Sequence, residues 1–284
     1  MYKYITIEIF KNFKKRAPSI IKSLSFPFLI IILSGFIIGF IIGLFSHDNN
    51  SFELGLFKGN IVLMLYVIYT IIIGIVMAVM IYQEAARGDN EHRVTFIKCL
   101  KSGNVLSFAL NVIVLFFSMA IIFLFASIAV SLILSLLHER SIISTSFAFM
   151  TLAATMIMFY IRAIIILPSS ALGDDISLSK AIKLTKGYNL LSFYTVLILP
   201  FIFSMLIGIL SLILVTLVLM FIGNGAENSM IVSIGYFVVF LLNVLTGVAV
   251  SIFTFVCILN LYKYIVNMNC NNERCDEVSN KLSK

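Results

Sequence analysis

The chain has 284 residues, of which 61% are hydrophobic and only 12% are charged, and its formal net charge is +7. A mean hydropathy of +1.10 means more apolar side chain than one soluble core can hide from water, so a membrane protein is indicated. The positive charge does not favour nucleic-acid binding, because the sequence offers no folded soluble domain to present it.

The N-terminal segment is basic and precedes the first long apolar run. Its six cations are Lys3, Lys11, Lys14, Lys15, Arg16 and Lys22. A secretory signal has a shorter apolar core and a small-residue cleavage site, so we expect a retained anchor instead.

Six stretches are apolar over about 20 residues or more, the length that a helix needs to cross roughly 30 Å of hydrocarbon. They are 25–45, 61–82, 105–137, 145–168, 190–222 and 230–262. Membrane strands would alternate apolar and polar residues, whereas these runs are apolar on all sides. The sequence therefore predicts one all-α polytopic membrane domain over 1–284, with six transmembrane helices and a cytoplasmic tail at 263–284.

The first run contains GFIIGFIIG, in which Gly35, Gly39 and Gly43 recur every fourth residue. Small residues at this spacing lie on one helix face and allow a second helix to approach closely. We expect them to pack helices, within the bundle or between protomers, rather than to line a substrate path.

Basic residues outside the runs are strongly biased to one side. Seventeen fall in the N-terminal segment, the connections 83–104 and 169–189, and the tail, whereas the other connections hold only Lys58 and Arg140. Because positive residues stay on the cytoplasmic side, both termini are predicted to be cytoplasmic. A basic cytoplasmic face is suited to anionic lipid headgroups.

Two polar connections have closely matching sequences. GDNEHRVTFIKCLKSGNVLSF (88–108) and GDDISLSKAIKLTKGYNLLSF (173–193) are identical at nine of 21 positions. The shared pairs are Gly88/Gly173, Asp89/Asp174, Ile97/Ile182, Lys98/Lys183, Lys101/Lys186, Asn104/Asn189, Leu106/Leu191, Ser107/Ser192 and Phe108/Phe193. Because polar residues are shared, chance identity is improbable, and an internal repeat of about 85 residues is indicated.

The later copy predicts a short amphipathic helix, with Ser177 as its N-cap and Gly187 closing it. Its lysines lie opposite its apolar residues, and the earlier copy repeats this pattern. The candidate lipid-binding residues are Lys98, Lys101, Lys180, Lys183 and Lys186. We expect the apolar faces to sink into the acyl boundary of the membrane while the lysines meet headgroups. The alternative is that they dock on a protein partner or on one another.

A weaker third copy is found in IEIFKNFKKRAPS near the N-terminus, where apolar and basic residues again lie on opposite sides. The repeat units would then be 5–82, 88–168 and 173–262, each a basic surface helix followed by two spans. The alternative is that only the two later copies exist.

Arg162 is the one ionisable residue that lies clearly inside a predicted span, six residues before Pro168 and so about 9 Å from the helix end. We expect its side chain to reach the cytoplasmic interface or to pair with Asp174 or Asp175. The alternative makes Arg162 an anion or headgroup contact. The equivalent residue in the earlier copy is Met77.

The sequence contains no motif of a metalloprotease, a serine hydrolase or a nucleotide-binding loop. Cys270 and Cys275 have no second pair of ligands near them, and tetrahedral zinc needs four. We expect no metal, no cofactor and no enzymatic activity.

The element from Arg162 through Leu167-Pro168 and Ala171-Leu172-Gly173 to Lys180-Ala181 and Leu184-Thr185-Lys186-Gly187 resembles a pattern in uncharacterised bacterial inner-membrane protein families. It is also similar to the membrane portion that precedes some glycerophosphodiester phosphodiesterase domains. The resemblance is specific over this element and extends to the remainder of the chain only as alternating spans. It implies a bacterial inner-membrane location. It implies no phosphodiesterase activity, because the chain has no room for that domain.

These observations favour a non-catalytic membrane protein that organises lipid or a partner at the cytoplasmic face. The alternative is a transporter, or the membrane subunit of one, for an anionic or amphipathic solute, because transporters often use repeated units.

Overall fold

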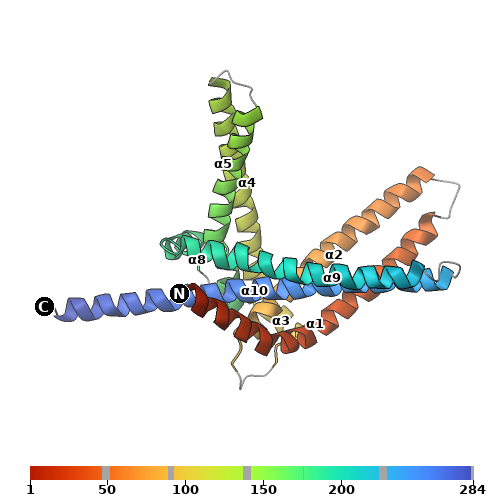
Figure 1. Cartoon of the computed structure of the whole chain (residues 1–284), viewed down its shortest axis with the longest axis horizontal. Helices are drawn as coiled ribbons and strands as arrows, with labels where there is room; N and C mark the ends of the chain where they lie inside the picture. Colours follow the sequence, from red (N-terminus) through yellow and green to blue (C-terminus); the bar gives the residue numbers. More distant parts are fainter. Residues whose placement is uncertain (47–51, 89–92, 137–141, 175, 224–228, 283–284) are drawn as a thin grey trace. The chain divides into compact units, whose positions relative to one another are not determined.

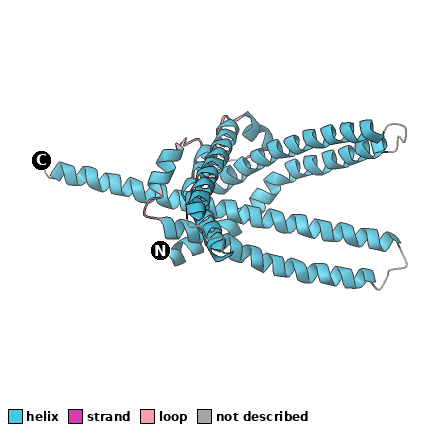
Figure 2. Cartoon of the chain, turned by 90° about the horizontal axis from the view of Figure 1, so that it is seen from above, coloured by secondary structure: helices cyan, strands magenta, loops and turns pink. Residues whose placement is uncertain are grey.

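The structure is a computed structural model that describes the backbone of all residues except 47–51, 89–92, 137–141, 175, 224–228 and 283–284. Side-chain environments are described for 1–38, 64–88, 93–132, 146–174, 176–220, 235 and 237–269. The described part has helices joined by loops and turns and contains no strand (Figures 1 and 2). Its elements are α1 (Tyr2–Ser46), α2 (Phe52–Ala86), α3 (Phe96–Lys101), α4 (Asn104–Leu136), α5 (Ile142–Ala163), α6 (Ile166–Leu172), α7 (Leu178–Leu184), α8 (Asn189–Phe193), the π-helical turn η1 (Tyr194–Ile198), α9 (Leu199–Gly223) and α10 (Ser229–Leu282).

Six segments of the described residues are long and apolar enough to cross a membrane. They are Tyr2–Ile38, Met64–Ala86, Asn104–Leu132, Ser146–Leu172, Asn189–Met220 and Phe237–Asn269. The predicted fold class, an all-α polytopic bundle with six spans, is therefore confirmed.

The protein surface of these spans is largely apolar. In the most apolar 18 residues of the Asn189–Met220 span none is buried within the protein, although the mean hydropathy there is 2.8. Water cannot cover an apolar surface of this extent at low free energy, whereas lipid chains can. The chain is accordingly an integral membrane protein.

Two helices continue past the predicted ends of their spans. The second span continues beyond 82 to Ala86, and the last continues to Asn269 while α10 itself continues to Leu282. The predicted tail at 263–284 therefore begins inside a helix. Polar residues after an apolar run predict the start of a connection, but a helix can carry them through its last turns at the membrane interface.

The N-terminal basic segment is not a separate surface helix. α1 runs from Tyr2 to Ser46 without interruption and contains Pro18 and Pro27. The two later basic helices are followed by Gly103 and Gly187, and Gly187 has φ +102°, which ends a helix readily. No glycine precedes Gly35 in the sequence, so the N-terminal segment lacks this stop signal. The threefold repeat, which this continuity does not support, stays a prediction.

Prolines mark two irregular points in the other spans. Pro168 has no N–H to donate to the carbonyl of Ile164, and α5 ends at Ala163 before α6 resumes at Ile166. Pro200 cannot donate to Val196, which lies in the π-helical turn η1. The fifth span therefore contains a π-helical turn next to its proline.

The residues form two compact units: unit 1 is 1–13, 115–166 and 176–284, and unit 2 is 14–114 and 167–175. In unit 1, α9 packs along α10 and the rings of Phe203 and Phe253 stack with their centroids 4.0 Å apart. Asn12 Nδ2 donates to Asn260 Oδ1 at 2.6 Å, a polar contact between α1 and α10.

In unit 2, α3 packs against α2, and α1 contacts α2 as well. The Tyr66 hydroxyl donates to the Ile31 carbonyl at 3.4 Å, which joins the first two spans. The ring of Phe26 on α1 meets that of Phe96 on α3 at a centroid distance of 5.9 Å.

Candidate functional site

Helix α7 has the predicted N-cap and two-sided character, and it ends at Leu184, ahead of the turn that contains Gly187. The Ser177 Oγ accepts a hydrogen bond from the Lys180 N–H at 3.4 Å, and so caps the helix. Ala181 and Thr185 are fully buried. The lysines at 180, 183 and 186 are exposed on the other side.

The most buried residues of α7 pack on protein, and contact of its apolar face with lipid stays a prediction. α7 contacts α5 and α10 of unit 1. Thr185 Oγ1 donates to the Arg162 carbonyl at 3.2 Å and to the Ala181 carbonyl at 3.0 Å. The larger apolar residues of the arc, Leu178, Ile182 and Leu184, are partly exposed. The small residues of the arc are therefore an intramolecular contact, and the lysines are left facing outward.

Helix α3 of unit 2 presents a wider apolar surface. Cys99 is buried against α2, with its thiol 3.9 Å from the Val76 carbonyl oxygen. Ile97 and Leu100 are 62% and 53% exposed, and Lys98 and Lys101 are exposed beside them. Burial raises the pKa of the Cys99 thiol to about 11. This cysteine is consequently a protonated packing group rather than a reactive thiolate.

Arg162 has an amide partner rather than a carboxylate. Its Nε donates to Asn189 Oδ1 at 2.9 Å, and the side chain is half-buried. Asp175, one of the expected partners, lies outside the described residues. The contact joins α5 to the first residue of α8 within unit 1. A neutral partner leaves the guanidinium charge uncompensated by that contact.

Of the three glycines expected to pack helices, one is described with its surroundings. A Cβ added at Gly35 would lie 2.9 Å from the Tyr66 hydroxyl of α2, so the glycine allows this close approach. Gly39 and Gly43 continue α1, but what surrounds them is outside the described part of the chain. Packing by the whole glycine stripe stays a prediction.

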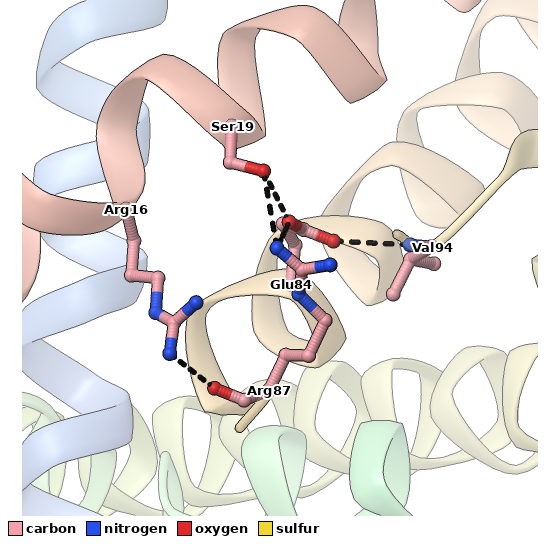
Figure 3. Close-up of polar contacts among 5 residues, drawn as sticks. All are labelled: Arg16, Ser19, Glu84, Arg87 and Val94. Carbon is pink, nitrogen blue, oxygen red and sulfur yellow. Dashed lines mark hydrogen bonds and ion pairs between the residues drawn. The ribbon is translucent and has the colours of Figure 1, made fainter. Parts of the chain in front are cut away.

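A buried carboxylate that the sequence reasoning missed lies at the end of α2 (Figure 3). Glu84 is fully buried and forms an ion pair with Arg87 at 2.9 Å. Its other oxygen accepts from the Val94 N–H at 3.0 Å, and Ser19 of α1 donates its hydroxyl to the same carboxylate. Arg16 Nη2 donates to the Arg87 carbonyl at 2.6 Å. We call these five residues the Glu84 cluster.

The Glu84 cluster joins α1 to the end of α2 and to the residues just before α3. A buried carboxylate costs much solvation free energy unless it is paired and hydrogen-bonded, and here it is both. Glu84 was assigned to a polar connection because the predicted span ended at 82. The available signal was the three-residue spacing of Glu84 and Arg87, which places them on one helix face.

Two cavities border the cluster within unit 2. The first, of about 350 Å³, has Arg87, Gln83 and Asn104 on its wall. The Gln83 and Asn104 amides both donate to the Ala171 carbonyl, at 3.0 and 3.2 Å. The second, of about 310 Å³, lies between α1 and α3 and has Arg93 on its wall. Val94, whose N–H donates to Glu84, lines both cavities.

The predicted lysines are thus divided between the units, with Lys98 and Lys101 in unit 2 and the other three in unit 1. Arg162 belongs to unit 1, whereas Gly35 and the Glu84 cluster belong to unit 2. No protein family, no curated protein and no solved structure matches the chain, so its function must be argued from these local geometries.

Proposed function

We propose that this protein organises anionic lipid at one face of the membrane through the exposed lysines of α3 and α7, without catalysing a reaction. The observation that carries the proposal is common to both helices. Each turns a buried face to its own unit, at Cys99 in α3 and at Ala181 and Thr185 in α7, and exposes its lysines. Cations held outward at the end of a membrane span attract anionic headgroups.

The membrane that suits this proposal is the bacterial inner membrane, with both termini in the cytoplasm. The support is the sequence resemblance and the bias of seventeen basic residues against two. Reporter fusions at each terminus test the orientation. Activity of a periplasm-specific reporter at either end would contradict it.

The lipid proposal is tested by replacing the five lysines at 98, 101, 180, 183 and 186 with glutamine. The purified protein is placed in bilayers that contain spin-labelled phosphatidylglycerol or spin-labelled phosphatidylcholine, and the motionally restricted fraction of each is measured. The wild type should prefer phosphatidylglycerol. Each exposed cation near the surface contributes about 1 kcal/mol, so the variant should lose most of this preference.

A matched control replaces Lys58 and Arg140, which charge bias assigns to the opposite side and whose side chains lie outside the described residues. This variant should retain the preference. An unchanged preference after replacement of the five lysines would contradict the proposal. So would depth measurements that show α3 and α7 standing in bulk water, and that result would favour a protein partner or a second copy of the chain as the occupant.

A transporter for an anionic solute is the second candidate, and the cavity beside Arg87 favours it. Its wall brings a guanidinium and two amides together at the end of α2. Anion uptake into protein-containing vesicles tests this function, with Arg87→Gln and Arg162→Gln as variants. Absence of flux for every anion class, or flux that neither variant changes, would count against it.

A further inference from the structure

The cavity of about 310 Å³ between α1 and α3 carries two cations that the Glu84 cluster does not use. Lys22 of α1 and Arg93, just before α3, both line it. Both are exposed, and neither forms an ion pair with a carboxylate of the described residues. Two cations on one wall, without a carboxylate partner among the described residues, attract a compact anion such as a phosphate.

The same cavity contains a buried hydroxyl that has no hydrogen-bond partner among the described residues. Ser23 lines it and is 8% exposed, and the Ser23 Oγ bonds to no described atom. A serine within a helix ordinarily bonds to a carbonyl one turn earlier, as Ser34 does to Ile31. Buried polar groups are nearly always satisfied, so a hydrogen-bonding ligand is indicated beside Ser23.

The remaining wall is apolar and open to the outside. Phe26 and Ile97 are 53% and 62% exposed, and Phe96 packs edge-on against Phe26. Such a cavity complements a phospholipid. Its cations face the anionic phosphate, and its exposed aromatic and aliphatic groups face the adjoining glycerol and acyl chains.

We propose that this cavity binds the phosphodiester of one anionic phospholipid. The phosphate oxygens accept hydrogen bonds from Lys22, Arg93 and Ser23, and the first methylene groups of the lipid lie against Phe26 and Ile97. Glu84 is a positioning residue, because its bond to the Val94 N–H holds the segment that carries Arg93.

The chain contains no tryptophan, so one introduced tryptophan reports on the cavity alone. Ile97→Trp places the reporter on the cavity wall. Leu100→Trp is the matched control, since Leu100 is on the same helix, 53% exposed, and does not line the cavity. Both proteins are placed in nanodiscs of phosphatidylcholine with a minor fraction of phosphatidylglycerol, and either lipid carries brominated acyl chains that quench tryptophan on contact.

Brominated phosphatidylglycerol should quench the tryptophan at position 97 more than brominated phosphatidylcholine does, and this preference should exceed that at position 100. Lys22→Gln or Arg93→Gln should lower the preference about fivefold, the contribution of one surface cation. Ser23→Ala should also lower it while leaving the thermal stability unchanged or higher, because it removes an unsatisfied hydroxyl. If Ser23 had only a structural role, its replacement would not lower the phosphatidylglycerol preference while leaving the thermal stability unchanged or higher.

Equal quenching by the two lipids at position 97 would overturn the proposal. So would relief of the quenching by inorganic phosphate at constant ionic strength, which would identify free phosphate as the occupant. If Ile97→Trp does not fold, Phe26→Trp reports on the same wall.

This inference rests on the proposed function and deepens it, and the two can fail separately. If replacement of the α3 and α7 lysines abolishes the overall phosphatidylglycerol preference while the Lys22, Ser23 and Arg93 variants behave as wild type, the cavity proposal fails and the general function stands. If no phosphatidylglycerol preference exists in the wild type, both fail.

Discussion

The two short basic helices share a sequence pattern but are held in different ways. α7 has a local cap from the Ser177 side chain, and its small residues pack on α5 and α10. The N-cap residue of α3, Thr95, makes no side-chain hydrogen bond, and the residue before it is held by the Glu84 carboxylate from α2. A repeated pattern can therefore rest on a local cap in one copy and on a tertiary ion-pair cluster in the other.

The buried polar groups also differ between the copies. Ser169 occupies the position equivalent to Glu84, and Met77 occupies the position equivalent to Arg162. The shared asparagines begin α4 and α8, but Asn104 donates to the Ala171 carbonyl whereas Asn189 accepts from Arg162. Two surface lysines and the asparagines that begin the next helices are thus among the shared residues, whereas Glu84 and Arg162, whose contacts join helices, are not shared.

The largest effect is expected from Glu84→Ala. It leaves the Arg87 charge in a largely buried site without its carboxylate and leaves the Val94 N–H without its acceptor, so the free energy of unfolding should fall by about 3 kcal/mol. Denaturant titration in mild detergent measures this loss. Ser169→Ala, the same position in the other copy, should cost no more than about 1 kcal/mol.

A double variant separates the ion pair from simple packing at this position. Replacing Glu84 and Arg87 together by leucine removes both charges, and paired apolar replacements are often neutral. The double variant should be more stable than Glu84→Ala. If the double variant is instead less stable than Glu84→Ala, the loss of stability in Glu84→Ala does not come from an unpaired buried charge. The larger expected effect at Glu84 than at Ser169 would then have no explanation.

A smaller effect is expected from the caps. Ser177→Ala removes the hydrogen bond to the Lys180 N–H and should destabilise α7 by about 0.5–1 kcal/mol, because the bond is long. Amide hydrogen exchange at Lys180 should accelerate accordingly. Thr95→Ala should change exchange in α3 very little. Equal acceleration in both helices would show that α3 also depends on its cap.

The smallest effect is expected from pH at Cys99. Its pKa in the folded protein is raised to about 11 from an ordinary value of 9.0, so the stability due to the buried neutral thiol is fully present below pH 9 and declines as the pH rises towards 11. Amide exchange of α3, corrected for its intrinsic pH dependence, should show constant stability from pH 7 to 9.

Thiol labelling adds a matched comparison between the copies at pH 8. In a background without other cysteines, a maleimide should label Cys99 slowly, since it is buried and protonated. Leu184→Cys, at the equivalent position of α7 and half-exposed, should react faster. Rapid labelling at position 99 would mean that α3 is undocked from α2.

The spans were predictable because the length of an apolar run is a local property that the membrane thickness sets. Their ends were less so. Glu84 looks like the start of a connection, and only the neighbouring Arg87, Ser19 and Val94 N–H make it acceptable inside the helix end. For Arg162, the sequence predicts the interface or the nearby Asp174 or Asp175 as surroundings. Its contact with Asn189, 27 residues away, depends on how α5 and α8 pack, and local sequence does not encode this.

The sequence by itself determined the helical membrane class and the number of spans, because hydropathy is carried by consecutive residues. It also determined that the two polar connections match and that their lysines lie opposite the apolar residues of a short helix, because this periodicity is local as well. Tertiary structure alone decided which face of each basic helix is buried, which carboxylate holds α3, and that Lys22, Ser23 and Arg93 line one cavity. Those features depend on contacts between segments that are distant in sequence, and no local pattern encodes which distant segments will meet.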